Sequence, residues 1–101
     1  MVLVQVSVVP VGTGTTSIGD PIADAVRVLR KARIKHEVSA VGTLFEGGSG
    51  RVFPLVSRMH EAAFRRGARR VITTIVVDDR RDKEVTMKSK VAAVKKRLAR
   101  G

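Results

Sequence analysis

The positions of apolar residues repeat with two different periods, which divide the chain into predicted strands and helices. Valine occupies positions 2, 4, 6 and 8, and this period of two is typical of a strand. The positions between the valines hold Leu3, Gln5, Ser7 and Val9. Pro10 is predicted to end the strand because proline cannot donate to a neighbouring strand. Residues 71–77, Val-Ile-Thr-Thr-Ile-Val-Val, form the strongest β-prone run.

Three further segments carry apolar residues at helical spacing. The first is predicted to begin with Asp20 as N-cap and Pro21 as first helical residue, and to end near Ala32. The second has a stripe from Val52 to Ala63, and Gly67 is predicted to stop it in a left-handed conformation. The last has its stripe at Met87, Val91, Val94 and Leu98.

The remaining segments are two short strands and three connections. His36–Val41 and Thr43–Gly47, hinged at Gly42, form either an antiparallel hairpin or one bent strand. The predicted connections are the glycine and hydroxyl-rich loop 11–17, the loop Gly47-Gly48-Ser49-Gly50 and the charged turn 78–83.

The resulting order, β-α-β-β-α-β followed by a helix, predicts one ferredoxin-like α+β domain over residues 1–101. Its sheet would be four-stranded and antiparallel, with both main helices on one face. The opposite face would carry Leu3, Gln5, Ser7 and Val9, a mixture too apolar to leave in water and too polar for a plain core. We therefore expect this face to be an oligomer interface that encloses a small ligand.

The amino-acid composition excludes several classes of protein and site. The 101 residues contain no cysteine, which excludes a disulfide scaffold and a zinc–thiolate site. No apolar run is long enough for a membrane span, and the N-terminus lacks the features of a signal peptide, so we expect a cytoplasmic protein.

The net charge of +11 is compatible with nucleic-acid binding, but it also simply keeps a small protein soluble. With three Phe and no Trp or Tyr, base stacking has little support.

Two motifs have both a chemical and a plain structural interpretation. The segment from Gly12 to Ser17 could hold an anion on backbone N–H groups, but spacing alone favours a turn, and it matches neither a Walker loop nor a dinucleotide fingerprint. Asp78, Asp79 and Asp82 have a spacing that can hold Mg²⁺, yet Arg80 and Arg81 favour a salt-bridged turn. His36 and His60 stand alone, without a metal-ligand or nucleophile partner. We therefore expect no metal and no cofactor.

Four ordered motifs resemble the family of small thiamine-binding, YkoF-related proteins. They are Val6-Ser7-Val8-Val9-Pro10-Val11-Gly12-Thr13-Gly14, Val41-Gly42-Thr43-Leu44-Phe45-Glu46-Gly47, Arg70-Val71-Ile72-Thr73-Thr74-Ile75 and Asp78-Asp79-Arg80-Arg81-Asp82-Lys83. The resemblance implies a ferredoxin-like protomer, a homotetramer built from dimers whose sheets meet, and binding of thiamine or its hydroxymethylpyrimidine moiety rather than catalysis.

The chain departs from the family pattern at Val41 and Phe45, where relatives usually carry Met or Leu and an aliphatic residue. Phe45 either stacks on an aminopyrimidine ring or fills space. The stretch 47–50 lacks the acidic residues often found there, and a net charge of +11 opposes long-range attraction of a cationic thiazolium. A phosphorylated or neutral pyrimidine would suit that charge better.

We expect the ligand site at the strand ends and the hairpin. One wall would come from Pro10, Gly12 and Thr13, and the other from Gly42, Thr43 and Glu46. Ser7 and Thr74 are weaker candidates from the sheet face. Glu46 either accepts from an aminopyrimidine or pairs with a nearby arginine as an edge-strand carboxylate. The expected function is a non-catalytic carrier, buffer or sensor, and the alternative is a basic nucleic-acid-associated protein.

Overall fold

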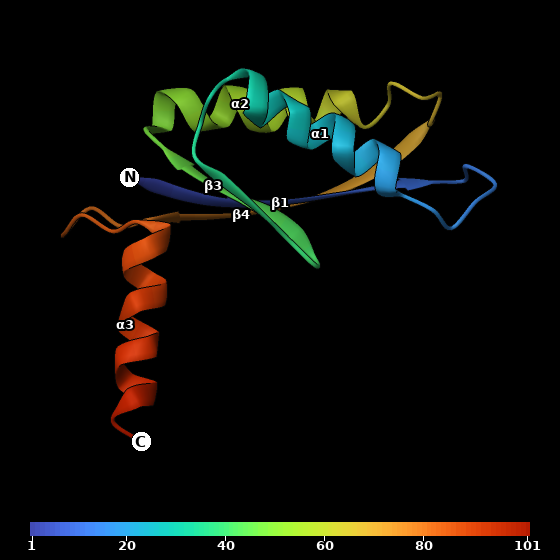
Figure 1. Ribbon diagram of the computed structural model, residues 1–101. Helices are drawn as coiled ribbons and strands as arrows, with labels where there is room; N and C mark the ends of the chain where they lie inside the picture. The colour runs from blue at the N-terminus through green and yellow to red at the C-terminus, as the bar shows by residue number, and fades with distance from the viewer.

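A four-stranded antiparallel sheet in the order β2-β3-β1-β4 organises the chain. The computed structural model describes residues 1–101. Its elements are β1 Val2–Val11, α1 Gly19–Lys31, β2 His36–Ser39, β3 Gly42–Gly47, α2 Ser49–Ala62, β4 Arg70–Asp79 and α3 Met87–Ala99. Helices α1 and α2 cover one face, and α3 stands away from the other (Figure 1). The predicted ferredoxin-like fold is confirmed.

The core lies between the sheet and the two covering helices. All four even-numbered valines of β1 are buried, as the period of two predicted. Leu29 of α1 and Met59 of α2 close over them, and burial of each such side chain contributes about 1.5–3 kcal/mol. Phe45 pairs with Val4 across β3 and β1 and has no exposed surface. It therefore fills space in the core and is not free to stack on a ligand.

The prediction that Pro10 ends the first strand is wrong. Strand β1 continues to Val11, and Pro10 pairs with Val71 of β4. The pairing of β1 with β3 stops at Val6, so beyond this residue β1 has a partner on one side only. A missing N–H is tolerated in a strand paired on a single side.

The prediction that Asp20 caps α1 is also wrong. The helix begins at Gly19 with Ile18 as its N-cap, which offers no side-chain hydrogen bond. The N–H of Ile22 already donates to the carbonyl of Ile18, so Asp20 lies inside the first turn and Pro21 is not the first helical residue. A carboxylate in that turn is favourable because the N-terminal end of a helix is partly positive.

The expected loop 47–50 is reduced to one residue, Gly48. Gly47 ends β3 and Ser49 begins α2. A Cβ at Gly47 would lie 3.0 Å from Cδ1 of Ile34 and 3.2 Å from Cγ1 of Val52. The glycine thus lets α2 and the segment after α1 pack closely on the sheet.

Three other boundaries of helices and strands differ from those predicted. Helix α2 ends at Ala62, and turns follow before Gly67, whose φ is +91°. The chain between β2 and β3 is a hairpin, as one alternative proposed, but its turn is Ala40-Val41 and Gly42 belongs to β3. Strand β4 extends through Asp79, so the charged turn begins only at Arg80.

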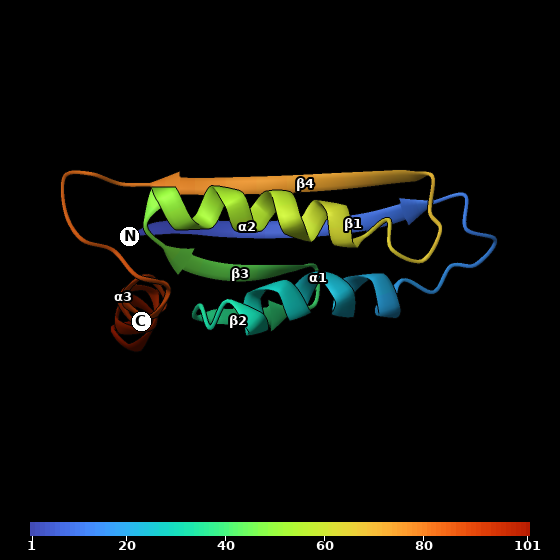
Figure 2. The same cartoon turned by 90° about the horizontal axis from the view of Figure 1, so that it is seen from above.

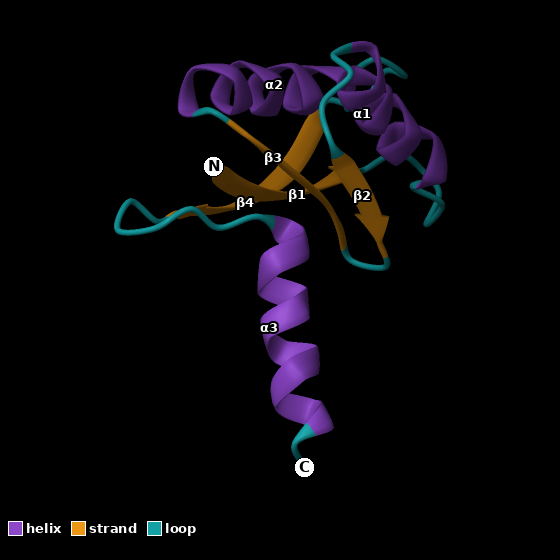
Figure 3. Cartoon of the chain, turned by 60° about the vertical axis from the view of Figure 1, so that its left-hand side comes forward, coloured by secondary structure: helices purple, strands orange, loops and turns teal.

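Helix α3 is attached through its first turn. Thr86 and Ser89 form a reciprocal capping box, which satisfies two backbone N–H groups. The N–H of Met87 donates to Oε2 of Glu46 at 2.8 Å, and Nζ of Lys90 donates to Asp78 at 2.6 Å. No side chain of α3 is buried, and the helix projects away from the sheet (Figure 3). These few contacts at its first turn therefore fix its position.

None of the helices is a candidate for crossing a bilayer. The longest, α2, has 14 residues, whereas a span needs about 20 apolar ones.

A buried carboxylate ties α1 to the segment after α2. Asp24 accepts from Nη1 of Arg27 at 2.8 Å and from Nε of Arg66 at 2.8 Å. The hydrogen bond from Arg66 lowers the pKa of Asp24 below its ordinary value of 3.8, and the charges of Arg66 and Arg27 act in the same direction.

We expect the Asp24 contribution to be acid-sensitive. Because the folded-state pKa is depressed, the stabilisation is complete above the ordinary value of 3.8 and is lost as the pH falls through the lower folded value. Urea unfolding should show Asp24→Asn less stable than the unsubstituted protein at neutral pH, with the two converging in acid. Asp20→Asn, on the exposed neighbour of Arg66, serves as control. A difference between Asp24→Asn and the parent that does not change with pH would contradict this role.

We expect Glu46 to anchor α3. Glu46→Ala leaves the N–H of Met87 without its acceptor, which costs about 1–3 kcal/mol locally. Hydrogen exchange and limited proteolysis over residues 85–101 should therefore accelerate, while the amides of β1 remain protected. Glu46→Gln keeps an acceptor oxygen and should behave like the parent chain in residues 85–101. Unchanged exchange in Glu46→Ala would show that other contacts hold the helix.

Candidate functional site

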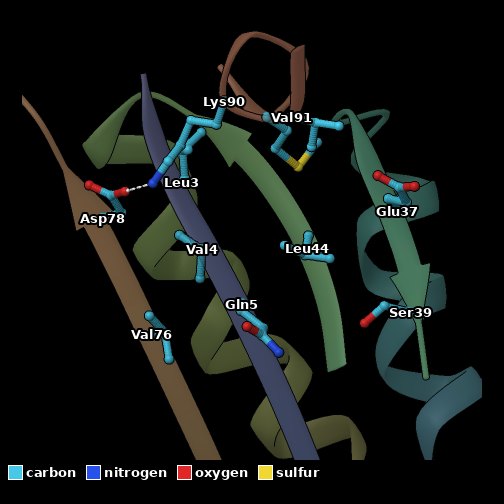
Figure 4. A pocket seen from close by; sticks show the side chains of 11 residues that line it. Leu3, Val4, Gln5, Glu37, Ser39, Leu44, Val76, Asp78, Lys90 and Val91 are labelled. Atoms are coloured by element: carbon cyan, nitrogen blue, oxygen red, sulfur yellow. Dashed lines mark hydrogen bonds and ion pairs between the residues drawn. The ribbon is translucent and has the colours of Figure 1, made fainter. Parts of the chain in front are cut away.

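A pocket of about 380 Å³ lies in the corner between the open face of the sheet and the base of α3. This size is in the range of small-molecule sites. Its floor is apolar, with Leu3, Leu44 and Val76 from three adjacent strands, and Met87 and Val91 of α3 form one wall (Figure 4).

The register of the sheet brings these residues together. Gln5 of β1 is opposite Leu44 of β3 on one side and Val76 of β4 on the other. Residues directly opposite share a face, so the three side chains line the same surface. The amide of Gln5 lies against Gly42, where a Cβ would come within 2.7 Å of Nε2. Glycine at position 42 thus leaves space for a polar group that can both donate and accept.

Two carboxylates lie at opposite sides of this floor, Asp78 from β4 and Glu37 from β2 (Figure 4). Asp78 accepts from Nζ of Lys90 at 2.6 Å, and both side chains of this pair are about half exposed. Ser39 completes the rim, and its hydroxyl donates to the carbonyl of Gly42 at 2.6 Å. The pocket therefore combines an apolar floor with acceptors at its edge, a combination suited to a flat ring that carries amino groups or positive charge.

The sequence-predicted residues do not form one site. Ser7, Gly42 and Thr43 line a hollow of about 100 Å³ between β1, the start of α1 and the hairpin turn. Pro10 and Thr13 line a separate hollow of about 280 Å³ beside Arg66.

The other predicted residues line none of these three cavities. Gly12 is exposed in the loop with a φ of +74°. Thr74 lies exposed on the open face, opposite Ser7.

Glu46 is buried beside the pocket but does not line it. Its Oε2 accepts from the backbone of Met87, and its Oε1 lies 3.7 Å from Nζ of Lys35. Of the two readings left open by the sequence, this geometry is nearer to a paired carboxylate, with lysine as the cation instead of arginine.

The three aspartates of the segment 78–82 have different partners. Asp78 pairs with Lys90, Asp79 with Arg81 at 2.8 Å and Asp82 with Arg80 at 2.6 Å. The bonds from Arg81 and Arg80 lower the pKa of Asp79 and Asp82 respectively. The expected ion pairs are present, and no cluster of three His, Cys, Asp or Glu side chains has metal-binding geometry.

Sequence reasoning missed Glu37, Asp78 and Lys90 as pocket residues. A signal existed for Asp78, because Ile72, Thr74, Val76 and Asp78 keep the period of two through the end of β4. That period places the carboxylate on the open face. No comparable signal marked Lys90, whose position depends on how α3 leaves the sheet.

The sequence of this chain is similar to a known protein family and to proteins of other organisms. The model of the thiamine-binding protein family matches residues 4–95. The UPF0045 protein YqgV of Bacillus subtilis is 37% identical over 97% of this chain and 98% of its own length. A UPF0045 protein of Methanothermobacter thermautotrophicus is 36% identical over 97% of this chain and all of its own.

Solved structures show the same fold. Protein MJ1052 of Methanocaldococcus jannaschii superposes with a TM-score of 0.84 at 30% identity, over 92% of this chain and 94% of its own. A Thermotoga maritima protein provisionally assigned to thiamine biosynthesis or salvage gives 0.76 at 22% identity, over 92% and 97%. The match over nearly the whole chain leads to one conclusion: this chain is a member of the thiamine-binding protein family.

Proposed function

We propose that this protein binds thiamine or its hydroxymethylpyrimidine moiety in the pocket beneath α3, as a carrier, buffer or sensor and not as a catalyst. The observation that carries the proposal is the placement of Asp78 and Glu37 at opposite sides of an apolar floor. The family name and the assignment of the Thermotoga relative support the choice of ligand.

The charges around the pocket suit such a ligand better than the net charge suggests. The chain carries +11 overall, yet the residues that line the pocket include two carboxylates and one ammonium group. Short-range contacts with carboxylates outweigh a screened long-range field, since the Debye length is about 8 Å at physiological salt. An aminopyrimidine can donate to one carboxylate while the thiazolium lies near the other.

We propose a non-catalytic role because the one hydroxyl on the rim of the pocket is not activated. A serine nucleophile needs a base that takes its proton. The Ser39 hydroxyl instead donates to a backbone carbonyl, which cannot do so. This hydroxyl is therefore not arranged as a nucleophile, which supports a role in binding.

We further propose that copies of the chain meet through the open face, giving the homotetramer that the family resemblance implies. Apolar side chains are exposed on this face at Val9, Ile72 and Val76, and along α3 at Val91, Val94 and Leu98. Large apolar side chains exposed in such number on one side of a small protein favour an interface. A folded protein that light scattering finds monomeric at micromolar concentration would contradict the assembly.

Calorimetry and thermal shift test the ligand. A ligand at about 100 times its Kd adds roughly 2.7 kcal/mol of stability, so thiamine or hydroxymethylpyrimidine should raise the Tm clearly. Asp78→Asn should weaken thiamine binding by roughly tenfold, or about 1.4 kcal/mol. Asp82→Asn, which also removes an ion-paired carboxylate but lies outside the pocket, should leave affinity unchanged. No shift with either ligand, together with tight, salt-sensitive RNA binding, would favour the nucleic-acid alternative.

Lys90 should act as an internal competitor for the cationic ligand. Its ammonium group occupies Asp78 in this structure, and an exposed pair of this kind contributes about 0.2–1 kcal/mol. Lys90→Met should therefore raise affinity for thiamine by up to about fivefold, with less effect on neutral hydroxymethylpyrimidine. Lys88→Met, on the next exposed lysine of α3, is the control. Weaker thiamine binding by Lys90→Met would show that Lys90 holds the ligand instead of competing with it.

A further inference from the structure

The layer formed by α1 and α2 carries a large excess of positive charge. Residues 19–35 and 49–69, which form the two helices and the segments directly after them, contain ten Lys and Arg but only three Asp and Glu. Their net charge is therefore +7, against +11 for the whole chain. One of the three carboxylates, that of Asp24, is buried. Positive charge concentrated on one surface raises the local potential and attracts anions.

Helices α1 and α2 lie side by side over the sheet and run in opposite directions (Figure 2). On α1, Arg27 and Lys31 are four residues apart and share one side of the helix. That side faces α2, because Arg27 donates to Asp24 and the same carboxylate accepts from Arg66, in the segment after α2. Both cations therefore border the line along which the two helices meet.

A second row of cations follows α2. Arg51 and Arg58 are seven residues apart, which is about two helical turns, and Arg65 follows after another seven. At one end of this row, the guanidinium group of Arg51 donates to the carbonyl of Ala32, directly after α1. At the other end, Arg65 lines a hollow together with Arg27 of α1. The row therefore runs for about 20 Å along the side of α2 that faces α1.

This hollow has a volume of about 510 Å³ and is lined only by Asp24, Arg27, Arg65 and Arg66. Because Asp24 accepts from Arg27 and from Arg66, it holds two of the three guanidinium groups in place. One carboxylate among three guanidinium groups leaves an excess of positive charge. No apolar residue lines the hollow, so it suits a small, strongly charged group such as a phosphate.

Several cations of this surface have no carboxylate to neutralise them. Lys31, Arg58 and Arg65 are exposed and take part in none of the ion pairs of the structure. The charged turn differs in this respect, because Arg80 and Arg81 are each paired with an aspartate. The cations between α1 and α2 are therefore available to an external anion.

We propose that the facing sides of α1 and α2 bind the phosphate backbone of double-stranded nucleic acid, independently of its base sequence. The binding surface consists of Arg27, Lys31, Arg51, Arg58, Arg65 and Arg66. A row of about 20 Å spans about six base pairs, since successive phosphates of one strand are about 3.4 Å apart along the helix axis. Eight of the ten cations in residues 19–35 and 49–69 are arginines, and the planar fork of arginine can donate two hydrogen bonds to one phosphate.

An anionic membrane and a single strand fit this surface less well. A helix that lies on a membrane needs apolar side chains beside its cations, and single strands are held by aromatic rings on which bases stack. The large apolar side chain exposed on α2 is Phe53. It lies about two turns before His60 on the same side of the helix, and His60 forms a hydrogen bond with Thr73 of β4. Phe53 is therefore on the side away from α1, whereas a duplex, with its bases stacked inside, presents the phosphates that the arginines can contact.

The proposed surface is separate from the ligand pocket and from the proposed contact between copies. It is on the outer side of α1 and α2, whereas the pocket and the open face are on the other side of the sheet (Figure 1). Copies that meet through their open faces would leave it accessible. The inference does not rest on thiamine binding, and saturating thiamine should leave the affinity for a duplex unchanged.

Fluorescence anisotropy with labelled DNA and RNA duplexes of about 20 base pairs tests the proposal. Two duplexes of unrelated sequence should bind equally, with Kd values of about 1–100 μM at physiological salt, the range of sequence-independent binding. The logarithm of the affinity should fall linearly with the logarithm of the salt concentration, because bound cations release counterions from the phosphates.

Two triple variants that remove the same charge locate the surface. The variant with Lys31→Gln, Arg58→Gln and Arg65→Gln should weaken duplex binding about fivefold for each lost phosphate contact at about 0.15 M salt, and should reduce the salt slope by about 0.9 for each. The control with Lys88→Gln, Lys95→Gln and Lys96→Gln, all exposed on α3, should change neither. None of the six side chains makes an ion pair in this structure, so both variants should fold like the parent chain.

Equal weakening by the two variants would show that net charge alone attracts the duplex, and would overturn the proposal. Failure to bind either duplex would also overturn it, as would equally tight binding of phosphatidylserine vesicles or of polyglutamate at the same salt concentration. Displacement of the duplex by thiamine would contradict the placement of the surface on α1 and α2. A failure of thiamine to raise the Tm would count against the ligand proposal alone, with duplex binding still expected.

Discussion

The rest of the structure depends on the burial of one face of β1. This strand is central in the sheet, pairing with β3 and β4, and its even-numbered valines supply the inner wall of the core. Because the period of a strand is two, fixing the valines under α1 and α2 forces Leu3, Gln5, Ser7 and Val9 onto the opposite face. The apolar floor of the pocket and the surface proposed for assembly are consequences of that single alternation.

The position of α3 on the open face also determines which interactions hold this helix in place. The helix has no buried side chain, and its base is held by Glu46 and Lys90. Packing therefore contributes little to its position, and hydrogen bonds and charge contribute most. The same first turn that attaches the helix also forms a wall of the pocket, so attachment of α3 and the shape of the pocket are linked.

Most of the fold could be predicted because it follows from periodicity and short connections. The valine alternation, the run 71–77, the two short β-prone runs and the helical stripes together predict every element and the ferredoxin-like order. The errors lie at boundaries where tertiary contacts override local preference. Pro10 remains in β1 because only one side is paired there, and Gly47-Gly48 forms almost no loop because α2 packs directly on the sheet.

The site was less predictable because it is assembled from residues far apart in sequence. Glycine and hydroxyl motifs predict a ligand site at the ends of the strands. The structure instead places Thr43 in the core, opposite Val6. Asp78 is visible in the sequence, but its charged neighbours predict a turn, whereas the structure places it as the penultimate residue of β4. Lys90 and Glu37 become neighbours of the pocket only through the placement of α3 and the hairpin.

The two connections from strand to covering helix differ in length, and this has a consequence for how the fold can change in evolution. Residues 12–18 join β1 to α1, whereas Gly48 alone joins β3 to α2. An inserted residue in the longer connection can be absorbed at the surface. An insertion at Gly48 would turn the apolar stripe of α2 out of the core or move the helix along the sheet. New loops, and with them new recognition surfaces, are therefore expected to arise in this lineage at the end of the molecule that carries residues 12–18.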